Sequence, residues 1–419
     1  MSIETTGTTT GTPARSTGTP ATAGSASTIR RVHGEELLTT ALPLQSYAFI
    51  RSPHPVEAEE RWRRSLHYHE RNTILVAFGD EVAEATVEGL PMRQNVRGRT
   101  VGMLGVSGVA THPMARRRGH IRALLTQLHG EMRDAGHAVS TLYPFRQSFY
   151  ERFGYVGFPK ARRIRLFPAG LDRVVRADVP GEVTFHRIGE VYDDYSGFVE
   201  RLLGERHGFS VSPPESAAQL RDDNDHWVVF ARQEGEITGA LLYRTTGFGQ
   251  DLEGAALLSR GHIARTLLLQ WLGRHLDQFS AFTFELPPDE RPDLWYVDVH
   301  YAEETKVASP THSAPMGRVL SVEGLAGIGA GPSRVTVEVV DDPFVGGIWT
   351  LDGSSGSLEV RRGGTPTATL TSHGLAALVY GVLDPEELVL QGYAVAEPES
   401  RTALATLFPP AAPYLFSSF

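Results

Sequence analysis

Apolar residues near position 120 repeat with the period of a helix, and segments with strand character flank them. Pro113 cannot donate to a sheet ladder, so the strand predicted over residues 104–111 ends before it. Residues 138–143 alternate and carry β-branched side chains, which predicts a second strand. The intervening helix has one apolar face, formed by Ile121, Leu124, Leu125, Leu128 and Met132. The pattern predicts a βαβ-like unit whose ligand lies at the carboxyl end of the first strand.

The turn between the first strand and the helix is basic and contains a glycine. It reads Arg116-Arg117-Arg118-Gly119. A helix that begins after such a turn offers unpaired backbone N–H groups and the positive end of its dipole to a phosphate, and arginines add charge-assisted bonds. A solvated basic corner is the alternative for an isolated run of arginines. The position directly after an apolar strand favours a diphosphate-bearing ligand instead. No dinucleotide or Walker glycine motif is present.

A second motif makes the match to a known family more specific. Residues 149–155 read Phe-Tyr-Glu-Arg-Phe-Gly-Tyr. With the arginine-glycine turn, they resemble the GNAT N-acetyltransferases, and within them the Eis-type (enhanced intracellular survival) branch. The resemblance implies acetyl-CoA as cosubstrate. It also implies pantetheine alignment and the oxyanion donor at Val109, Ala110 and Thr111, pyrophosphate contacts at Arg117, Arg118, Gly119, His120, Ile121 and Arg122, and a further contact pair at Phe145 and Arg146.

Two residues are predicted to carry proton transfer. Tyr150 matches the family's general acid, and a phenol stays protonated at neutral pH. The alternatives are that Tyr150 is an ordinary half-buried aromatic residue, or that Tyr155 takes the role; we expect Tyr155 to be structural. Residues 413–419 include three aromatic side chains, so we expect this segment to be docked. In the resembled family the terminal carboxylate, here that of Phe419, is the base; Glu84, Glu88 or a water are the alternatives.

The chain is expected to form three units after a tail. Residues 1–28 are rich in threonine and lack the features of a secretory signal, so they are predicted to be a disordered tail. Residues 29–165 contain both motifs. Residues 166–305 repeat the strand and helix pattern without the basic turn, and residues 306–419 show short strands followed by helices. The resemblance implies an α/β and α+β fold: tandem GNAT domains, the second degenerate, then a sterol-carrier-protein-2-like domain.

Composition excludes some chemistries and disfavours others. The net charge of −9 argues against nucleic acid as a partner. The absence of cysteine excludes disulfides and an acetyl-cysteine relay. No apolar run reaches the ~20 residues of a membrane span, so the cytoplasm is expected. The acidic run at residues 222–226 cannot converge on one ion, so it is expected to be a solvated turn, and no metal site is predicted.

The sequence therefore predicts an N-acetyltransferase acting by direct transfer. The expected acceptor is an amine of a small molecule, of aminoglycoside, polyamine or natural-product type. Ser418 stands where an acidic side chain would have favoured a cationic amine. A protein lysine acetyltransferase and a carrier of lipids or hydrophobic ligands are the alternatives. A homohexamer is implied by the resemblance alone.

Overall fold

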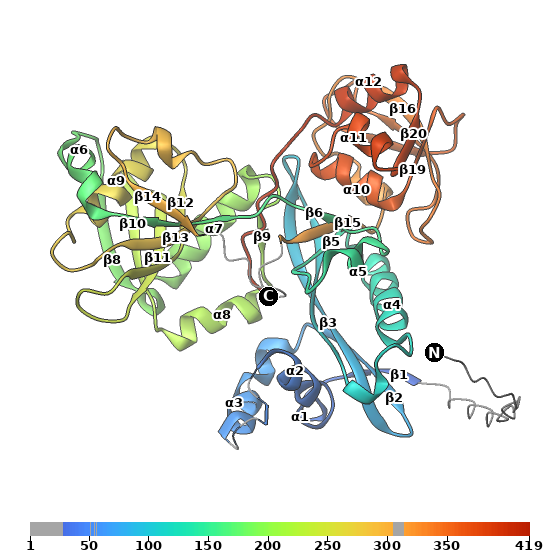
Figure 1. Cartoon of the computed structure of the whole chain (residues 1–419), viewed down its shortest axis with the longest axis horizontal. Coiled ribbons are helices and arrows are strands. Elements are labelled where there is room, and N and C mark those ends of the chain that lie inside the picture. Colours follow the sequence, from blue (N-terminus) through green and yellow to red (C-terminus); the bar gives the residue numbers. More distant parts are fainter. Residues whose placement is uncertain (1–27, 51, 54, 56, 305–313) are drawn as a thin grey trace, which may run out of the picture.

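The computed structural model describes residues 28–50, 52–53, 55, 57–304 and 314–419. The predicted tail lies outside these residues, except for Thr28, which begins the first strand. The chain forms three lobes, and the C-terminus lies between them (Figure 1). Within the described residues, no helix is both long and apolar enough to cross a bilayer.

The first sheet carries the predicted βαβ-like unit. Its strands lie in the order β1-β2-β3-β4-β5-β15-β6, and β9 pairs with β3. β4 and β5 are parallel and are joined by helix α4. The apolar face of α4 packs on the sheet, with Leu124, Leu125 and Leu128 fully buried. The bounds are β1 (Thr28–Val32), β2 (Thr73–Gly79), β3 (Val82–Val96), β4 (Arg99–Thr111), α4 (His120–Asp134), β5 (Val139–Leu142), α5 (Gln147–Glu151), β6 (Val156–Gly157), β9 (Ser210–Val211) and β15 (Met316–Val319).

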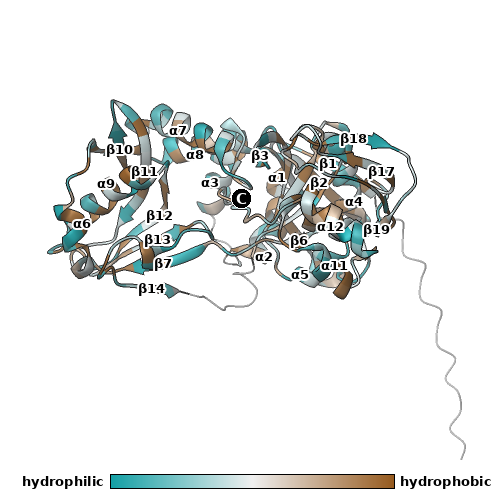
Figure 2. Ribbon diagram, turned by 90° about the horizontal axis from the view of Figure 1, so that it is seen from above, coloured by the Kyte–Doolittle hydropathy of each residue, from teal (hydrophilic) through white to brown (hydrophobic). Residues whose placement is uncertain are grey.

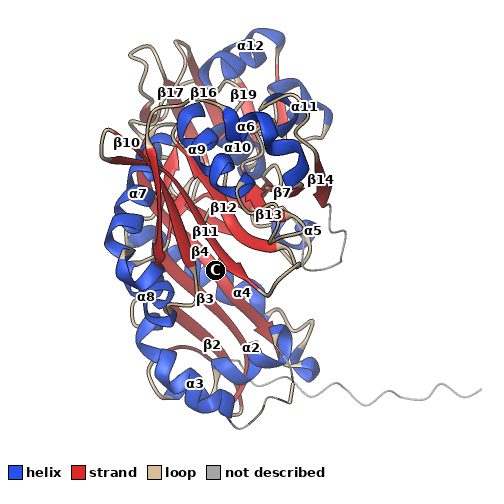
Figure 3. Ribbon diagram, turned by 90° about the vertical axis from the view of Figure 1, so that its left-hand side faces the viewer, coloured by secondary structure: helices blue, strands red, loops and turns tan. Residues whose placement is uncertain are grey.

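Short helices at the start of the chain lie at one end of the long strands β3 and β4 (Figure 3). Helix α2 packs on both strands. These elements are α1 (Glu36–Thr39), α2 (Ala41–Phe49), α3 (Glu57–Ser65) and the 3-10 helix η1 (Leu66–His69).

Gly89 of β3 faces α4, since an added Cβ would lie 2.7 Å from Leu128. Its neighbours along β3 therefore face away from α4. We call this opposite side of the first sheet the acceptor face.

The second sheet repeats the first in topology. Its order is β14-β7-β13-β12-β11-β10-β8, and β12 and β13 are parallel across helix α9. Gly261 precedes α9 at φ +116°, as Gly119 precedes α4 at φ +89°. Arg260, however, bonds Glu205 and Glu236, so its charge is already paired. The bounds are β7 (Arg162–Leu166), α6 (Asp172–Arg176), β8 (Glu182–Arg187), α7 (Tyr192–Glu205), α8 (Pro214–Asp223), β10 (Trp227–Gln233), β11 (Glu236–Thr245), β12 (Leu252–Ser259), α9 (His262–Gly273), β13 (Phe282–Leu286) and β14 (Tyr301–Glu304).

The third unit is a five-stranded sheet with three helices, and it shares a core with the first unit. Met92 and Met103 of the first sheet belong to the same buried cluster as Trp349 and Tyr380. Figure 2 shows both apolar and polar positions along the helices and strands of the chain. The bounds are β16 (Arg334–Val339), β17 (Gly347–Asp352), β18 (Glu359–Arg362), β19 (Ala368–Leu370), α10 (Ser372–Tyr380), α11 (Pro385–Leu390), β20 (Ala394–Ala396) and α12 (Pro398–Leu407). The predicted fold class, two similar α/β units followed by an α+β unit, is confirmed.

Strands cross between the three units. β15 follows the second unit in the chain but lies in the first sheet, between β5 and β6. The predicted division at residue 165 falls inside β7, which pairs with β13 and β14 of the second sheet. The predicted division at residue 305 falls outside the described residues. Both divisions stay predictions.

Candidate active site

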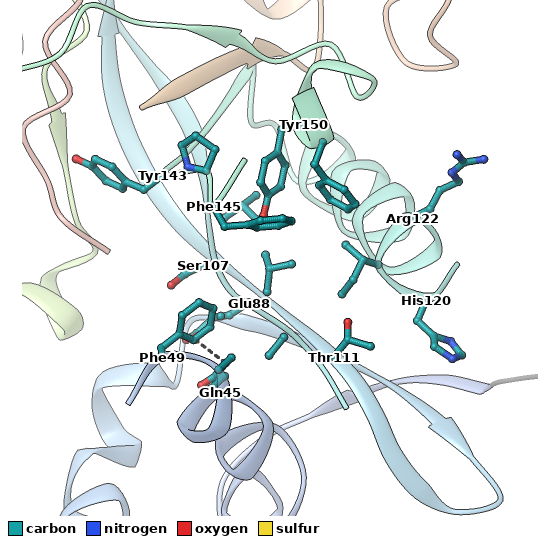
Figure 4. A pocket seen from close by; sticks show the side chains of 18 of the residues that line it. Gln45, Phe49, Glu88, Ser107, Thr111, His120, Arg122, Tyr143, Phe145 and Tyr150 are labelled. Carbon is teal, nitrogen blue, oxygen red and sulfur yellow. Dashed lines mark hydrogen bonds between the residues drawn. The ribbon is translucent and has the colours of Figure 1, made fainter. Parts of the chain in front are cut away.

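The parallel strands β4 and β5 separate at one point, and this opens a cavity. Their pairing runs from Met103 and Val139 to Val106 and Leu142. Pro144 follows shortly after and has no N–H to continue a ladder, while β4 continues to Thr111. The cavity has a volume of about 1330 Å³, and residues from β4, α2, α4 and α5 line it (Figure 4). The backbone of β4 beyond Val106 is thus positioned to pair with an extended ligand.

A β-bulge shapes β4 within the cavity. Glu88 pairs with Ser107, whereas Thr86 pairs with Ala110, so β4 holds one extra residue. Gly108 lies in the bulge at φ +58°, and an added Cβ would clash with the side chain of Gln45. Glycine is required by both the backbone conformation and this close approach.

The basic turn, residues 116–119, lines the end of the cavity beside the start of α4. Gly119 is the N-cap of α4 at φ +89°, and Arg117 also has a positive φ, of +66°. The first N–H groups of α4 have no partner within the helix. Arg117 and Arg122 line the cavity, whereas Arg118 bonds the carboxylate of Glu84 at 2.9 Å. This end matches the charge and hydrogen bonding of a diphosphate.

The two tyrosines of the aromatic motif have different surroundings. Tyr150 is 2% exposed and lines the cavity, and its hydroxyl points toward the middle of it (Figure 4). Burial raises the pKa of the Tyr150 hydroxyl above its ordinary value, which keeps the group protonated. The Tyr155 hydroxyl bonds His129 at 2.9 Å and Ser140 at 2.7 Å in the core. Of these two tyrosines, Tyr150 is the one whose hydroxyl is directed into the cavity.

The C-terminal segment is held by the stretch of chain between α7 and α8, which includes β9. Phe416 stacks on Phe209 with ring centroids 4.6 Å apart. The hydroxyl of Ser417 donates to the carbonyl of Ser210, in β9, at 2.9 Å. Because β9 pairs with β3, these contacts fix the segment against the first sheet. The expectation that residues 413–419 are docked is confirmed.

Phe419 lies in the cavity on the acceptor face. Its ring packs over Gly105 of β4, where an added Cβ would lie 3.1 Å from the ring. The ring also meets Tyr143 edge to face at a centroid distance of 5.6 Å, and the Tyr143 hydroxyl donates to the carbonyl of Ser417. Phe419 and Tyr150 line the same cavity, although 269 residues of sequence separate them.

A buried carboxylate forms the floor of the cavity beside α2. Glu88 is bonded by His69 Nδ1 at 2.7 Å and by Asn72 Nδ2 at 2.7 Å, and Gln45 Nε2 lies at 3.5 Å. Burial alone would raise the pKa of Glu88. The hydrogen bond from His69, the charge of His69 and the amides of Asn72 and Gln45 together lower the pKa below its ordinary value. The site therefore holds a carboxylate at neutral pH.

Most of the predicted site residues lie together. The cavity is lined by Val109, Ala110, Thr111, Arg117, Gly119, His120, Ile121, Arg122, Phe145, Tyr150 and Phe419. Arg118 and Arg146 lie outside this lining, and Arg146 is exposed where α5 begins. The roles predicted for all of these residues stay predictions.

Sequence reasoning overlooked part of the site. The cavity is also lined by Gln45, His69 and Arg152, and by Arg116 of the predicted basic turn. Tyr47, Ala48, Phe49 and Ile50, at the end of α2, line the same part of the cavity as His69. The particular contribution of His69 had no signal in the sequence, because it depends on contact with Glu88, which lies 19 residues away.

Comparison with known proteins identifies two domains. Residues 28–157 match the acetyltransferase (GNAT) domain family, and residues 322–416 match the sterol carrier protein domain family. N-acetyltransferase Eis of Mycobacterium tuberculosis (strain ATCC 25177 / H37Ra) is 39% identical over 67 residues, which cover 16% of this chain and 17% of that protein. The match therefore spans about a sixth of the curated relative.

Solved structures share the fold along nearly the whole chain. Eis1 from Mycobacterium abscessus has a TM-score of 0.74 at 19% identity, covering 94% of this chain and all of its own. GNAT acetyltransferases from Kribbella flavida (TM-score 0.75, 23% identity, 94% and 99% coverage) and Anabaena variabilis (0.79, 17%, 94% and 100%) are similarly close. At these identities the likeness shows the fold.

Proposed function

We propose that this chain, which joins a GNAT acetyltransferase domain to a sterol carrier protein domain as the Eis-type proteins it resembles do, transfers acetyl from acetyl-CoA to an amine of a small molecule. One observation carries the proposal: the strand split, the basic turn, Tyr150 and Phe419 border a single cavity. Two chemically distinct ends of this cavity meet at the split.

The cosubstrate fits the residues of one end. The N–H groups at the start of α4, with Arg117 and Arg122, would hold the pyrophosphate. The open edge of β4 beyond Val106 would align the pantetheine arm like an added strand. The thioester carbonyl would then lie beside the bulge at Gly108, where backbone N–H groups can stabilise the developing oxyanion.

Two groups would move protons during the transfer. The hydroxyl of Tyr150 would donate its proton to the leaving sulfur, since it is protonated and directed into the cavity. The terminal carboxylate of Phe419 would take a proton from the attacking nitrogen, directly or through a water. Its place is supported by the packing of the Phe419 ring over Gly105.

The other end of the cavity favours an amine with an apolar part. Tyr47, Phe49 and Ile50 line it, and each is more than half exposed. Beneath them lies the carboxylate of Glu88. An anion under an apolar rim suits a cationic amine of a small molecule, although Ser418 adds no second charge. Assembly as a hexamer is part of this proposal and is tested by the solution mass.

The test is thiol release from acetyl-CoA with a panel of small amines, an aminoglycoside and a lysine peptide. We expect release that depends on a small amine, and acetylated product by mass spectrometry. Release with the peptide alone would favour a protein lysine acetyltransferase. No release with any amine, together with saturable binding of a fluorescent fatty acid, would favour a carrier built on the third unit.

A further inference from the structure

A carboxylate-bound histidine lies at the acceptor end of the cavity. His69 is the last residue of η1, and its side chain is one-third exposed. Its Nδ1 lies 2.7 Å from a carboxylate oxygen of Glu88. An ionised carboxylate only accepts hydrogen bonds, so Nδ1 carries the hydrogen. In the neutral ring the lone pair is then on Nε2, the nitrogen that remains for a ligand in the cavity.

Glu88 is itself fixed before any ligand enters. It is 5% exposed, and Asn72 and Gln45 approach it in addition to His69. Its carboxylate can therefore neither turn away nor be replaced by water without leaving these amides unpaired. The carboxylate holds the ring orientation of His69 and stabilises the positive charge that the ring acquires on protonation.

The strand register places this pair beside the point of transfer. Glu88 pairs with Ser107, the first residue of β4 beyond the last β4–β5 pair. The ring of Phe419 packs over Gly105, which lies two residues before Ser107 and on the same face of the sheet. Two residues of strand span about 7 Å. His69–Glu88 and Phe419 thus lie on the acceptor face, near Ser107.

The proton balance of amine acetylation requires more than one proton acceptor. An alkylamine at neutral pH is an ammonium ion, which must lose one proton to free the lone pair that attacks the thioester carbon. When the C–N bond has formed and the C–S bond breaks, the nitrogen loses a second proton and the thiolate gains one. One proton is released overall. In the proposed function, Tyr150 supplies the proton that the CoA thiolate gains, and Phe419 takes the second proton from the nitrogen. The first proton then has no acceptor.

We propose that His69 Nε2 removes the first proton from the bound ammonium, with Glu88 as its positioning residue. This inference rests on the proposed acetyl transfer. Glu88 supplies the charge that faces His69 from β3, and Asn72 and Gln45 contribute neutral amides. Arg71, in the adjacent turn, is paired with Glu215 of α8 at 2.8 Å. The carboxylate of Phe419 is the other anionic group of the cavity.

The first experiment compares acceptors that differ in protonation. His69→Gln keeps a polar side chain of similar size but cannot carry the proton. For an alkylammonium acceptor at pH 7, we expect kcat/KM to fall by about 10²–10³-fold. For an aromatic amine, which is already neutral at this pH, it should stay within about threefold of the original protein. An equal loss with both acceptors would show a structural role and overturn the proposal, as would no loss with either.

The second experiment concerns Glu88. Burial lowers the pKa of His69, whereas the hydrogen bond to Glu88 and the charge of Glu88 raise it. The two effects of Glu88 outweigh burial, so the pKa lies above its ordinary value. Glu88→Gln should therefore shift the ascending limb of the pH profile to lower pH and lower its plateau. Gln45→Met removes one amide from Glu88 but no charge, so it should shift the limb less than Glu88→Gln does. A limb that does not move in Glu88→Gln would contradict the positioning role.

A third measurement does not depend on a folded glutamine variant. In His69→Ala, imidazole in the buffer should raise the rate with the alkylammonium acceptor at least tenfold, because imidazole can take the same proton. Absence of rescue in a protein that still binds acetyl-CoA would overturn the proposal. If the original protein acetylates no amine, the proposed function itself fails; if it does and His69→Gln is unchanged, only this inference fails.

Discussion

At the scale of single residues, surroundings decide what a side chain can do. Tyr150 and Tyr155 lie five residues apart, both are buried, and their ring centroids are 6.0 Å apart. The hydroxyl of Tyr155 is taken by Ser140 and His129, whereas that of Tyr150 is directed into the cavity. The two tyrosines should therefore respond to the same substitution in different ways.

Tyr150→Phe should lower kcat by about 10²–10⁴-fold with little change in the acetyl-CoA KM, because an acid that acts on the leaving sulfur stabilises only the transition state. Tyr155→Phe is the matched control. It should destabilise the fold by about 1–3 kcal/mol through the loss of buried hydrogen bonds and leave kcat near its original value. Steady-state kinetics and thermal melting separate the two effects. The reverse pattern would assign the acid to Tyr155.

The carboxylate and the ring of Phe419 can be tested separately. Two glycines appended after Phe419 keep the ring but move the carboxylate, and we expect kcat to fall at least 10²-fold. Phe419→Ala keeps the carboxylate and loses the packing over Gly105, so a smaller loss is expected. Acetyl-CoA affinity, measured by calorimetry, should be unchanged in both. Full activity of the extended protein would move the base to Glu84, Glu88 or a water.

At the scale of elements, the start of α4 combines two properties that substitution can separate. Gly119 has a φ of +89°, and an added Cβ would meet nothing within 4 Å. Alanine there would introduce only backbone strain, of about 1–2 kcal/mol. Aspartate would add the same strain and a negative charge where the pyrophosphate is expected.

We therefore expect Gly119→Asp to raise the acetyl-CoA KM at least tenfold more than Gly119→Ala, through repulsion between like charges. Steady-state kinetics at low and high salt make the comparison, since screening by salt should reduce the difference in acetyl-CoA KM between the two variants. Equal effects of the two variants would mean that the phosphates lie elsewhere.

The sequence predicted elements that are local in the chain better than contacts between distant ones. The apolar period of α4, the proline that ends β4 and the glycine before the helix each specify structure within a few residues. The acidic pair Asp341-Asp342, which a proline follows, is typical of a turn. Asp342 does cap a turn, but it also forms a buried salt bridge with Arg318 at 2.8 Å. Such a partner depends on the tertiary fold.

At the scale of the whole molecule, one junction joins all three units. Arg97, in the turn between β3 and β4, donates to the carbonyls of Leu378 and Val379 in the third unit. Its backbone N–H donates to Nδ1 of His207 in the second unit, and Nε2 of His207 lies 3.0 Å from the carbonyl of Tyr380. The ring of His207 accepts at one nitrogen and donates at the other, so this arrangement requires the neutral form.

Burial and the charge of Arg97 lower the pKa of His207 to about 4, against about 6.5 when unfolded. The unfolded chain thus binds the proton first, so this contribution to stability is complete above pH ~6.5 and is lost as the pH falls toward 4. We expect the unfolding free energy to decline by up to about 1.4 kcal/mol per pH unit in this window. His207→Gln, which can make both hydrogen bonds, should flatten the slope measured by denaturant titration at several pH values.

The position of β15 between β5 and β6 has a consequence for how the protein is made. During synthesis, residues 139–142 and 156–157 leave the ribosome about 160 residues before the strand that joins them. Until then β5 exposes an edge that can pair with other chains. The strand order therefore delays completion of the first sheet until the second unit has been translated, and a nascent chain stalled before residue 316 should depend on chaperones.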